Sequence, residues 1–365
     1  MNRHLAVERA LAGNLLVVCG PGGVGKTTTA AALALAAASQ GRKTLVCTID
    51  PSKRLRTSLG LARLTGTPQK VKGRLFAMRL DPKQTFDDLV RRHAATAEAR
   101  DRVLSNRFYQ QISRHLAGTH EVMAMEALMS LFDDFDLVVL DTPPAASAVA
   151  FLDAPKRVQD FVDGRVLRYF LKPYFVAGRL ALEPRTIVGR TLLRVLDAAA
   201  GLQFLRELSE FFLAFEGLFD SFRRTAQAME LKLRAEGTSF LLVTTPSSSR
   251  VAEVRAFAGV LSDRSMRAAA IVANRAHPWT IDGASAIATL AGKRTSGFTP
   301  SVQAELMGIA DRERARAENE AIHLRQLRSK GGLETIAIPE LDQDVHDLKS
   351  LGVVAAWLCP RVGAV

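Results

Sequence analysis

The segment CGPGGVGKTTTA, residues 19–30, constrains the fold of this chain more than any other stretch. It contains the frame Gly-x-x-x-x-Gly-Lys-Thr, and it stands between an apolar run at 14–19 and an alanine-rich run at 27–41. The first run is typical of a buried parallel strand, and the second is typical of a helix that ends at Gly41. A strand, a glycine-rich turn and a helix in this order predict a phosphate-binding loop.

The chemistry of phosphate binding explains the residue types in this loop. Glycines let the backbone curl so that its N–H groups point at phosphate oxygens. Lys26 supplies a positive charge for the β- and γ-phosphates, and the hydroxyl of Thr27 suits a Mg²⁺ ligand. We therefore predict that the loop binds Mg-ATP. The predicted nucleotide-binding residues of the loop are Gly20, Gly22, Gly23, Val24, Gly25, Lys26, Thr27 and Thr28.

Apolar runs alternate with helical stretches along much of the chain, with a long helical excursion expected at about 84–132. Short apolar strands separated by helices favour an α/β fold with a doubly wound, mostly parallel sheet. Beyond the first strand, the predicted strands lie at 43–50, 73–82, 136–144, 238–246, 267–275 and 333–341.

Strand signals disappear between roughly residues 155 and 235. The stretch from Leu202 to Phe222 carries leucine and phenylalanine at helical spacing, and the segment at 166–175 is aromatic and basic. We predict a nucleotide-binding domain made of residues 1–150 and 236–365, with a helical subdomain inserted at 151–235. Two interpretations of the insertion stay open, an ordinary packed subdomain and an apolar surface for a client or membrane partner. Residues 277–300 are expected to form a loop-rich connection.

Composition limits the remaining function classes. The net charge of +12 permits binding to nucleic acid or to an anionic membrane surface without requiring either. No uncharged apolar run reaches eighteen residues and the N-terminus has no signal-peptide core, so we expect a cytoplasmic protein, with peripheral membrane association as an option. Cys19, Cys47 and Cys359 form no Cys-x-x-Cys pair, and we expect them to be small buried residues rather than zinc ligands.

Two carboxylates follow predicted strands at the edge where open α/β sheets place their ligands. Asp141 follows LVVL and is predicted to hold Mg²⁺, either directly or through a water. Asp50 follows LVCTI and could orient the attacking water. Alternatively, it could contact the groups that bind Mg²⁺ without binding the ion itself.

The chain resembles the family of the arsenite-pump ATPase and the ATPase that targets tail-anchored membrane proteins, which are related to the Min and partitioning ATPases. The resemblance spans about residues 14–355, and it implies a dimeric ATPase whose helical subdomain rearranges with ATP and binds a client or membrane partner. The matching segments are GPGGVGKTT, IDPSKRLRTSLG, AMRLDP, DLVVLDTPP, VANR and IPELDQDVHDLKSL.

The resemblance also implies roles for single residues. Asp50 matches the aspartate that positions the hydrolytic water, and Asp141 matches the aspartate of the second switch segment. Asn274 matches the asparagine that reads the adenine, and Pro339 matches the proline of the loop packed near it. Together with Lys26, Asp50 is the implied catalytic residue.

One departure from the family pattern concerns Pro21, which replaces a lysine that reaches across family dimers to the other subunit's phosphates. Proline offers no ammonium group. Either a nearby cation among Lys53, Arg54 and Arg56 replaces that lysine, or a related subunit that keeps the lysine pairs with this chain. The cysteines that would support a zinc clamp or arsenite binding are missing as well.

Two other functions remain open at this point. A partitioning or positioning ATPase that binds DNA or a membrane surface would explain the basic charge. A weakly hydrolysing subunit of a heteromeric ATPase would explain the absent lysine.

Overall fold

The structure is a computed structural model, and it describes residues 4–50, 52–93, 96–106, 109–110, 119–142, 149–157, 223–282, 299–329 and 333–360. Most of the predicted insertion at 151–235 lies outside the described residues, including the stretch at 202–222 and the segment at 166–175. The chain divides into two compact units. The first comprises Met1–Arg79, Phe132–Val149 and Leu233–Val365, and the second comprises Leu80–Leu131 and Ala150–Lys232.

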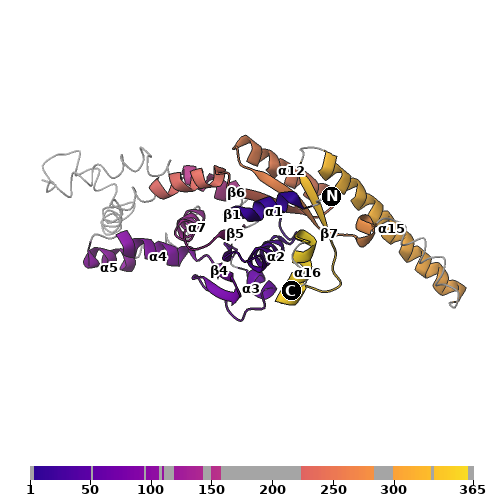
Figure 1. The fold of residues 1–365 in the computed structure, drawn as a ribbon, viewed down its shortest axis with the longest axis horizontal. Helices are drawn as coiled ribbons and strands as arrows, with labels where there is room; N and C mark the ends of the chain where they lie inside the picture. Colours follow the sequence, from indigo (N-terminus) through magenta and orange to yellow (C-terminus); the bar gives the residue numbers. More distant parts are fainter. Residues whose placement is uncertain are drawn as a thin grey trace, which may run out of the picture. The chain divides into compact units, whose positions relative to one another are not determined.

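An eight-stranded sheet organises the first unit, in the order β3–β4–β2–β5–β1–β6–β7–β8 (Figure 1). Neighbouring strands are parallel except for the antiparallel pair β3–β4. The α/β fold with a mostly parallel sheet is therefore confirmed. The strands are β1 (Leu15–Cys19), β2 (Thr44–Thr48), β3 (Gln69–Lys72), β4 (Leu75–Arg79), β5 (Leu137–Asp141), β6 (Thr238–Thr244), β7 (Ala268–Ala276) and β8 (Glu334–Pro339).

The strands that could be predicted from the sequence are the buried ones, because a buried strand is a continuous apolar run. Every residue of β1, β2, β5 and β6 is buried, as expected for parallel strands that helices cover on both faces. Strand β3 has the sequence QKVK and alternates between half-buried and exposed positions at the edge of the sheet. It was not predicted, because a short polar edge strand lacks the apolar run that marks the others.

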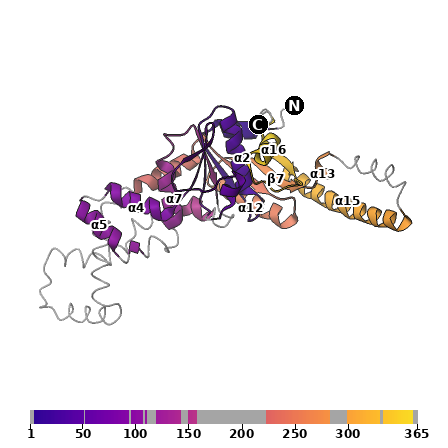
Figure 2. The same cartoon turned by 90° about the horizontal axis from the view of Figure 1, so that it is seen from below.

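Helices cover both faces of this sheet. Helices α1 (Leu5–Ala12), α2 (Lys26–Ser39) and α16 (Leu348–Leu358) share one apolar core with residues of the central strands. Helix α12 (Ser248–Asp263) contacts β6 and β7, and Figure 2 shows α2 and α12 on opposite sides of the strands. The short helix α3 (Arg54–Ser58) follows β2.

A short helix and a long one lie between β7 and β8. Helix α13 (Pro278–Asp282) occupies the start of the stretch predicted as a loop-rich connection, whose residues 283–298 lie outside the described part. Helix α15 (Pro300–Ser329) presents mostly exposed residues of both charge signs.

The described part of the second unit is helical, and it includes most of the stretch at about 84–132 that was assigned to an excursion of the nucleotide-binding domain. It contains α4 (Pro82–His93), α5 (Ala97–Ser105) and α7 (Thr119–Met129), and residues 149–157 and 223–232 are also helical. Helix α4 packs on α5 and α7.

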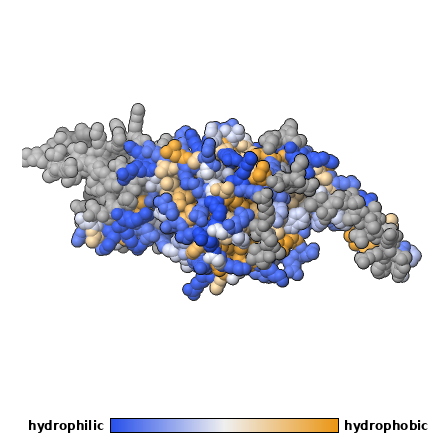
Figure 3. All heavy atoms as spheres, viewed as in Figure 1, coloured by the Kyte–Doolittle hydropathy of each residue, from blue (hydrophilic) through white to orange (hydrophobic). Residues whose placement is uncertain are grey.

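The surface and the cysteines agree with the expectations from composition. Hydrophilic and apolar residues are interspersed on the face drawn in Figure 3. Cys19, Cys47 and Cys359 are free and buried. Across the described ranges, every helix is too short or too polar to cross a membrane.

Candidate nucleotide-binding site

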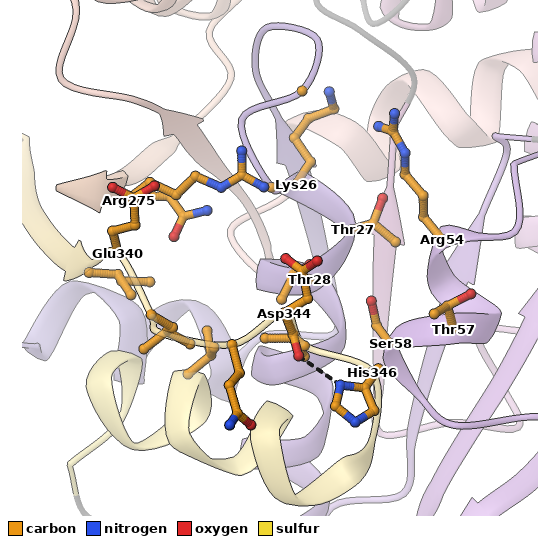
Figure 4. Close-up of a pocket in the computed structure, with 18 of the residues that line it drawn as sticks. Lys26, Thr27, Thr28, Arg54, Thr57, Ser58, Arg275, Glu340, Asp344 and His346 are labelled. Carbon is orange, nitrogen blue, oxygen red and sulfur yellow. Dashed lines mark hydrogen bonds between the residues drawn. The ribbon is translucent and has the colours of Figure 1, made fainter.

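The carboxyl ends of three adjacent strands bring the predicted site together. Because β2, β5 and β1 are neighbours in the sheet, Asp50, Asp141 and the phosphate-binding loop meet at the carboxyl ends of these strands. A cavity of about 960 Å³ opens there (Figure 4). Four segments, at 22–28, 50–58, 274–275 and 338–346, contribute most of its lining.

The first glycine of the loop is required by a close backbone contact. Gly20 has φ +152°, and a Cβ at this position would stand 2.0 Å from the carbonyl oxygen of Val243 in the neighbouring strand β6. Any larger residue would push the loop off the sheet. Gly20 therefore supports the loop from behind, while Gly22, Gly23 and Gly25 line the cavity.

Lys26 begins helix α2 and is 7% exposed. Its Nζ donates a hydrogen bond of 2.8 Å to the carbonyl oxygen of Pro21. Burial lowers the pKa of Lys26, the carboxylate of Asp141 opposes that effect, and the positive charge of Arg54 adds to it. Proline at position 21 therefore keeps the backbone acceptor that orients the lysine, although it has no side-chain charge of its own.

Asp141 ends β5 and is almost completely buried. Its Oδ2 accepts hydrogen bonds from the hydroxyls of Thr27 at 2.8 Å and Thr48 at 2.9 Å. Burial raises the pKa of Asp141 to about 6, while these two hydrogen bonds and the charge of Lys26 act in the opposite direction. Its other oxygen, Oδ1, is buried and has no hydrogen-bond partner among the described residues.

This arrangement fits a magnesium ion bound with a nucleotide. A buried carboxylate oxygen without a partner costs free energy unless a cation or water meets it, and the Thr27 hydroxyl next to it is a suitable oxygen ligand. Neither here nor elsewhere in the described part do three or more His, Cys, Asp or Glu side chains form a group that could hold a metal ion by themselves. A Mg²⁺ here would therefore take its remaining ligands from phosphate oxygens and water, as it commonly does.

Asp50 lines the cavity and is half-buried. Its Oδ1 accepts a hydrogen bond of 2.9 Å from the backbone N–H of Ser52, and its own N–H donates to the hydroxyl of Thr48 at 3.1 Å. Thr48 thus contacts both Asp50 and Asp141. Among the described residues no hydrogen bond engages its other carboxylate oxygen, and a carboxylate that lines the cavity could orient a water beside a phosphate.

Asn274 joins the loop to β7. Its Nδ2 donates a hydrogen bond of 2.9 Å to the carbonyl oxygen of Val24. Gly25 makes this approach possible, because it has φ +94° and a Cβ there would stand 2.2 Å from the same nitrogen. Asn274 therefore braces the phosphate-binding loop and also lines the cavity, and its contact with adenine stays a prediction.

A backbone irregularity adds a cation that the sequence pattern did not predict. The pairing of β7 with β8 shifts register between Ala273 and Ala276, and Arg275 there has φ +56°. Successive side chains of a regular strand point to opposite faces, but Asn274 and Arg275 both line the cavity. Figure 4 shows the Arg275 side chain beside the phosphate-binding loop.

The segment after β8 closes the same side of the cavity. Pro339 ends β8 and lines the cavity, as do Glu340 and His346. The N–H of Glu340 donates to the carbonyl oxygen of Ala276, and its carboxylate is held by Arg316 of α15 at 2.9 Å. Pro339 therefore lines the same cavity as Asn274, and its contact with adenine stays a prediction.

The three cations proposed as replacements for a lysine at position 21 differ in placement. Lys53 and Arg54 line the cavity. Arg56 is absent from its lining and donates instead to the carbonyl oxygen of Ala62 at 3.1 Å.

Sequence reasoning missed Thr48 and Arg275. Thr48 carried a usable signal, because a hydroxyl that ends a strand two residues before Asp50 points toward the same edge. Arg275 carried none, because strand alternation places it opposite Asn274 unless the bulge is known.

Sequence comparisons agree with this geometry. The sequence profile of the family described as anion-transporting ATPases matches residues 14–294. An uncharacterized protein of Streptomyces coelicolor is 34% identical over 72% of this chain and 62% of its own length. The protein named ATPase ASNA1 homolog 2 of Paramecium tetraurelia is 32% identical, over 42% of this chain and 48% of that protein. A putative arsenical pump-driving ATPase 1 of Aquifex aeolicus is 24% identical, over 48% and 44%.

These alignments cover less than two thirds of each relative's length, so activity, substrate and partners are not transferred with the family name. The family itself follows from a profile match over most of the chain together with the loop, Asp50 and Asp141 at one edge of a parallel sheet. This chain belongs to the anion-transporting ATPase family.

Proposed function

We propose that the chain binds Mg-ATP in the cavity at the ends of β1, β2 and β5 and hydrolyses it to ADP and phosphate. The observation that carries this proposal is the buried pair of Thr27 and Asp141, with one carboxylate oxygen unpartnered in the described part, directly behind a lysine-bearing phosphate loop. Thr27 and Asp141 would hold Mg²⁺, which would neutralise charge on the β- and γ-phosphate oxygens.

Asp50 is the residue we assign to the attacking water. In hydrolysis the water oxygen bonds to the γ-phosphorus as the bond to the β–γ bridging oxygen breaks. ADP leaves with that electron pair, and the proton of the water passes to the phosphate product or to solvent. Lys26 stabilises the negative charge on the phosphates throughout, and its buried position strengthens that interaction.

A finer role, also a proposal, is that ATP drives a conformational switch. Segments 50–58 and 338–346 contact the same cavity, so a nucleotide would bias the conformation of both. In this scheme the helical insertion at 151–235 binds a client or membrane partner, and the chain works as a dimer with itself or with a related ATPase subunit. The +12 charge keeps a DNA- or membrane-positioning role as the second candidate.

Titration calorimetry with Mg-ATP tests the nucleotide site, with turnover assays on the same samples. Lys26→Ala should weaken ATP binding by roughly 10- to 150-fold, because a charge-assisted contact contributes about 1.5–3 kcal/mol. Lys70→Ala, which removes an exposed lysine from the edge strand β3, serves as the control and should bind like the parent. Equal affinity in Lys26→Ala and the parent would place the nucleotide elsewhere.

The second candidate is tested by retention on DNA and on anionic vesicles as salt increases. Phosphate contacts give a steep linear fall of the logarithm of affinity with the logarithm of salt concentration. Binding with such a slope that also requires ATP would favour the positioning role over a client-binding role.

A further inference from the structure

Arg54 occupies a distinct position in the cavity. It is the first residue of α3, a helix whose Leu55 and Ser58 are buried, so its backbone is anchored while its own side chain is exposed. The side chain lines the cavity, and Figure 4 shows its guanidinium rising toward the same region as the ammonium of Lys26. No hydrogen bond or ion pair engages this guanidinium within the described ranges of the chain.

Two cations that face the same space repel each other, and this repulsion acts within the site. The charge of Arg54 contributes to the lowered pKa of Lys26. The two carboxylates nearby, Asp50 and Asp141, make their hydrogen bonds in the described part to other groups, since Asp141 accepts from two threonines and Asp50 accepts from the N–H of Ser52. An anion from outside the protein, bound between Lys26 and Arg54, would attract both cations and offset the repulsion between them.

The neighbouring cations fit this role less well. The guanidinium of Arg56 is turned to the carbonyl of Ala62, outside the cavity lining. Lys53 precedes α3, where its carbonyl oxygen accepts from Thr57, and its ammonium is a flexible point charge. Only an arginine offers a planar fork that matches two oxygens of a phosphate group.

We propose that Arg54 donates hydrogen bonds to the terminal phosphate of a nucleoside triphosphate bound in its own chain, opposite Lys26. This inference rests on the proposed ATPase function and sharpens it. The cation missing at Pro21 is then supplied within the chain by the first residue of α3, and the site needs no positive charge from a second subunit. The charge that grows on the γ-phosphate oxygens during hydrolysis meets Lys26 from one side and Arg54 from the other.

The first test compares ATP with ADP for the full-length protein and its variants. Arg54→Ala should weaken ATP binding by roughly 10- to 100-fold and leave ADP binding nearly unchanged, because only ATP carries the phosphate that Arg54 reaches. Its turnover at saturating ATP should fall by about 100-fold or more, as for loss of one donor to a developing charge. Arg54→Lys should recover part of the ATP affinity, and Arg63→Ala, an exposed arginine outside the cavity lining, is the matched control.

The second test distinguishes a contact within the chain from one across a dimer. Mixing Lys26→Ala, which keeps Arg54, with Arg54→Ala, which keeps the intact loop, should leave the turnover no higher than the sum of the separate proteins. Recovery of activity on mixing would show that Arg54 serves a partner's phosphate and would overturn the proposal.

The remaining outcomes separate this inference from the proposed function. If the parent binds and hydrolyses ATP while Arg54→Ala behaves like the parent, the role of Arg54 is wrong and the ATPase proposal stands. An equal loss of ATP and ADP affinity would also overturn it, because the contact would not be to the terminal phosphate. If the parent neither binds nor hydrolyses ATP, both are overturned. Preserved ADP binding in Arg54→Ala shows that the variant is folded.

Discussion

At one end of the cavity the loop at 20–28 and the ends of β2 and β5 are held by buried strands, whereas the opposite end is carried by a bulge and a connecting segment. We call the first the phosphate end and the second, made of residues 274–275 and 338–346, the β8 end. Asp141 and Lys26 of the phosphate end are buried and hydrogen-bonded. At the β8 end Glu340 and His346 are exposed, and Arg275 has a left-handed backbone conformation.

This difference has a chemical reason. Phosphate oxygens and Mg²⁺ demand donors and ligands at fixed positions, and buried strands hold such groups without further ordering on binding. A base and ribose are recognised by shape and a few hydrogen bonds, for which a surface segment is sufficient. We expect changes at the phosphate end to affect turnover, and at Lys26 affinity as well, whereas changes at the β8 end should affect affinity alone. Asn274, which joins the two ends through Val24, should affect both.

The largest expected effect comes from Asp50 at the phosphate end. Asp50→Asn should lower turnover by about 100-fold or more, within the range for loss of a group that positions or deprotonates a water. Affinity for Mg-ATP should change little, because the role proposed for Asp50 is toward the attacking water rather than toward the phosphates. Asp263→Asn, at an exposed position that ends α12, is the control. Unchanged turnover in Asp50→Asn would remove Asp50 from the mechanism and weaken the distinction between the two ends.

The junction between the two ends is tested at Gly25. Gly25→Ala should destabilise the protein by about 1–2 kcal/mol from the left-handed backbone alone, and by more because the new methyl group meets Asn274. Gly41→Ala is a matched control, since Gly41 has φ +89° and a methyl group there would meet no described atom within 4 Å. Denaturant unfolding measures both.

The difference between these two glycine variants isolates the contact with Asn274. Adding Asn274→Ala to Gly25→Ala should recover part of the lost stability, because it removes the nitrogen that the methyl group meets. Equal losses in Gly25→Ala and Gly41→Ala would mean that the brace between loop and β7 contributes nothing.

Smaller effects are expected for Arg275 at the β8 end, a gain in protein stability and a loss of ATP affinity. Arg275→Gly should stabilise the protein by up to about 1 kcal/mol, because glycine adopts φ +56° without strain. It should also weaken ATP binding by roughly fivefold, the equivalent of one hydrogen bond of about 1 kcal/mol. Ser265→Gly relieves a φ of +56° away from the cavity lining, so it should stabilise without changing affinity. ATP binding unchanged by Arg275→Gly would show that the bulge does not serve the nucleotide.

The smallest effect is expected at Pro21. Pro21→Lys keeps the carbonyl that accepts from Lys26, and Arg54 already supplies a cation to the site, so turnover should rise little. A comparison of initial rates at several protein concentrations measures it. A large gain, especially one that grows with concentration, would mean that the phosphate end lacks a charge and depends on a second subunit.

Much of the phosphate end could be predicted because its signals are local. Each of β1, β2 and β5 is a short apolar run with a functional residue at or near its end: Gly20 follows β1, Asp50 lies two residues after β2, and Asp141 ends β5. The loop carries its glycines, Lys26 and Thr27 within nine residues. Parallel strands place their carboxyl ends at one edge, so Asp50 and Asp141 could be assigned to the site without knowledge of their order in the sheet.

The β8 end depended on the tertiary structure. A bulge between β7 and β8 turned Arg275 into the cavity, and the pairing of Gly25 with Asn274 joins residues far apart in the chain. Strand alternation predicts the reverse orientation for Arg275, because the register shift is a property of the paired strands rather than of either sequence.

The sequence by itself determined the α/β class, the phosphate-binding loop and the two strand-end carboxylates. Each of these follows from local patterns of neighbouring residues along the chain. The sequence left three cations equivalent after Asp50. The tertiary structure separated Arg56 from the other two, since the burial of Leu55 and Ser58 fixes the rotation of α3. That rotation sends Arg54 to the cavity and Arg56 to the carbonyl of Ala62, a choice that depends on what the helix packs against.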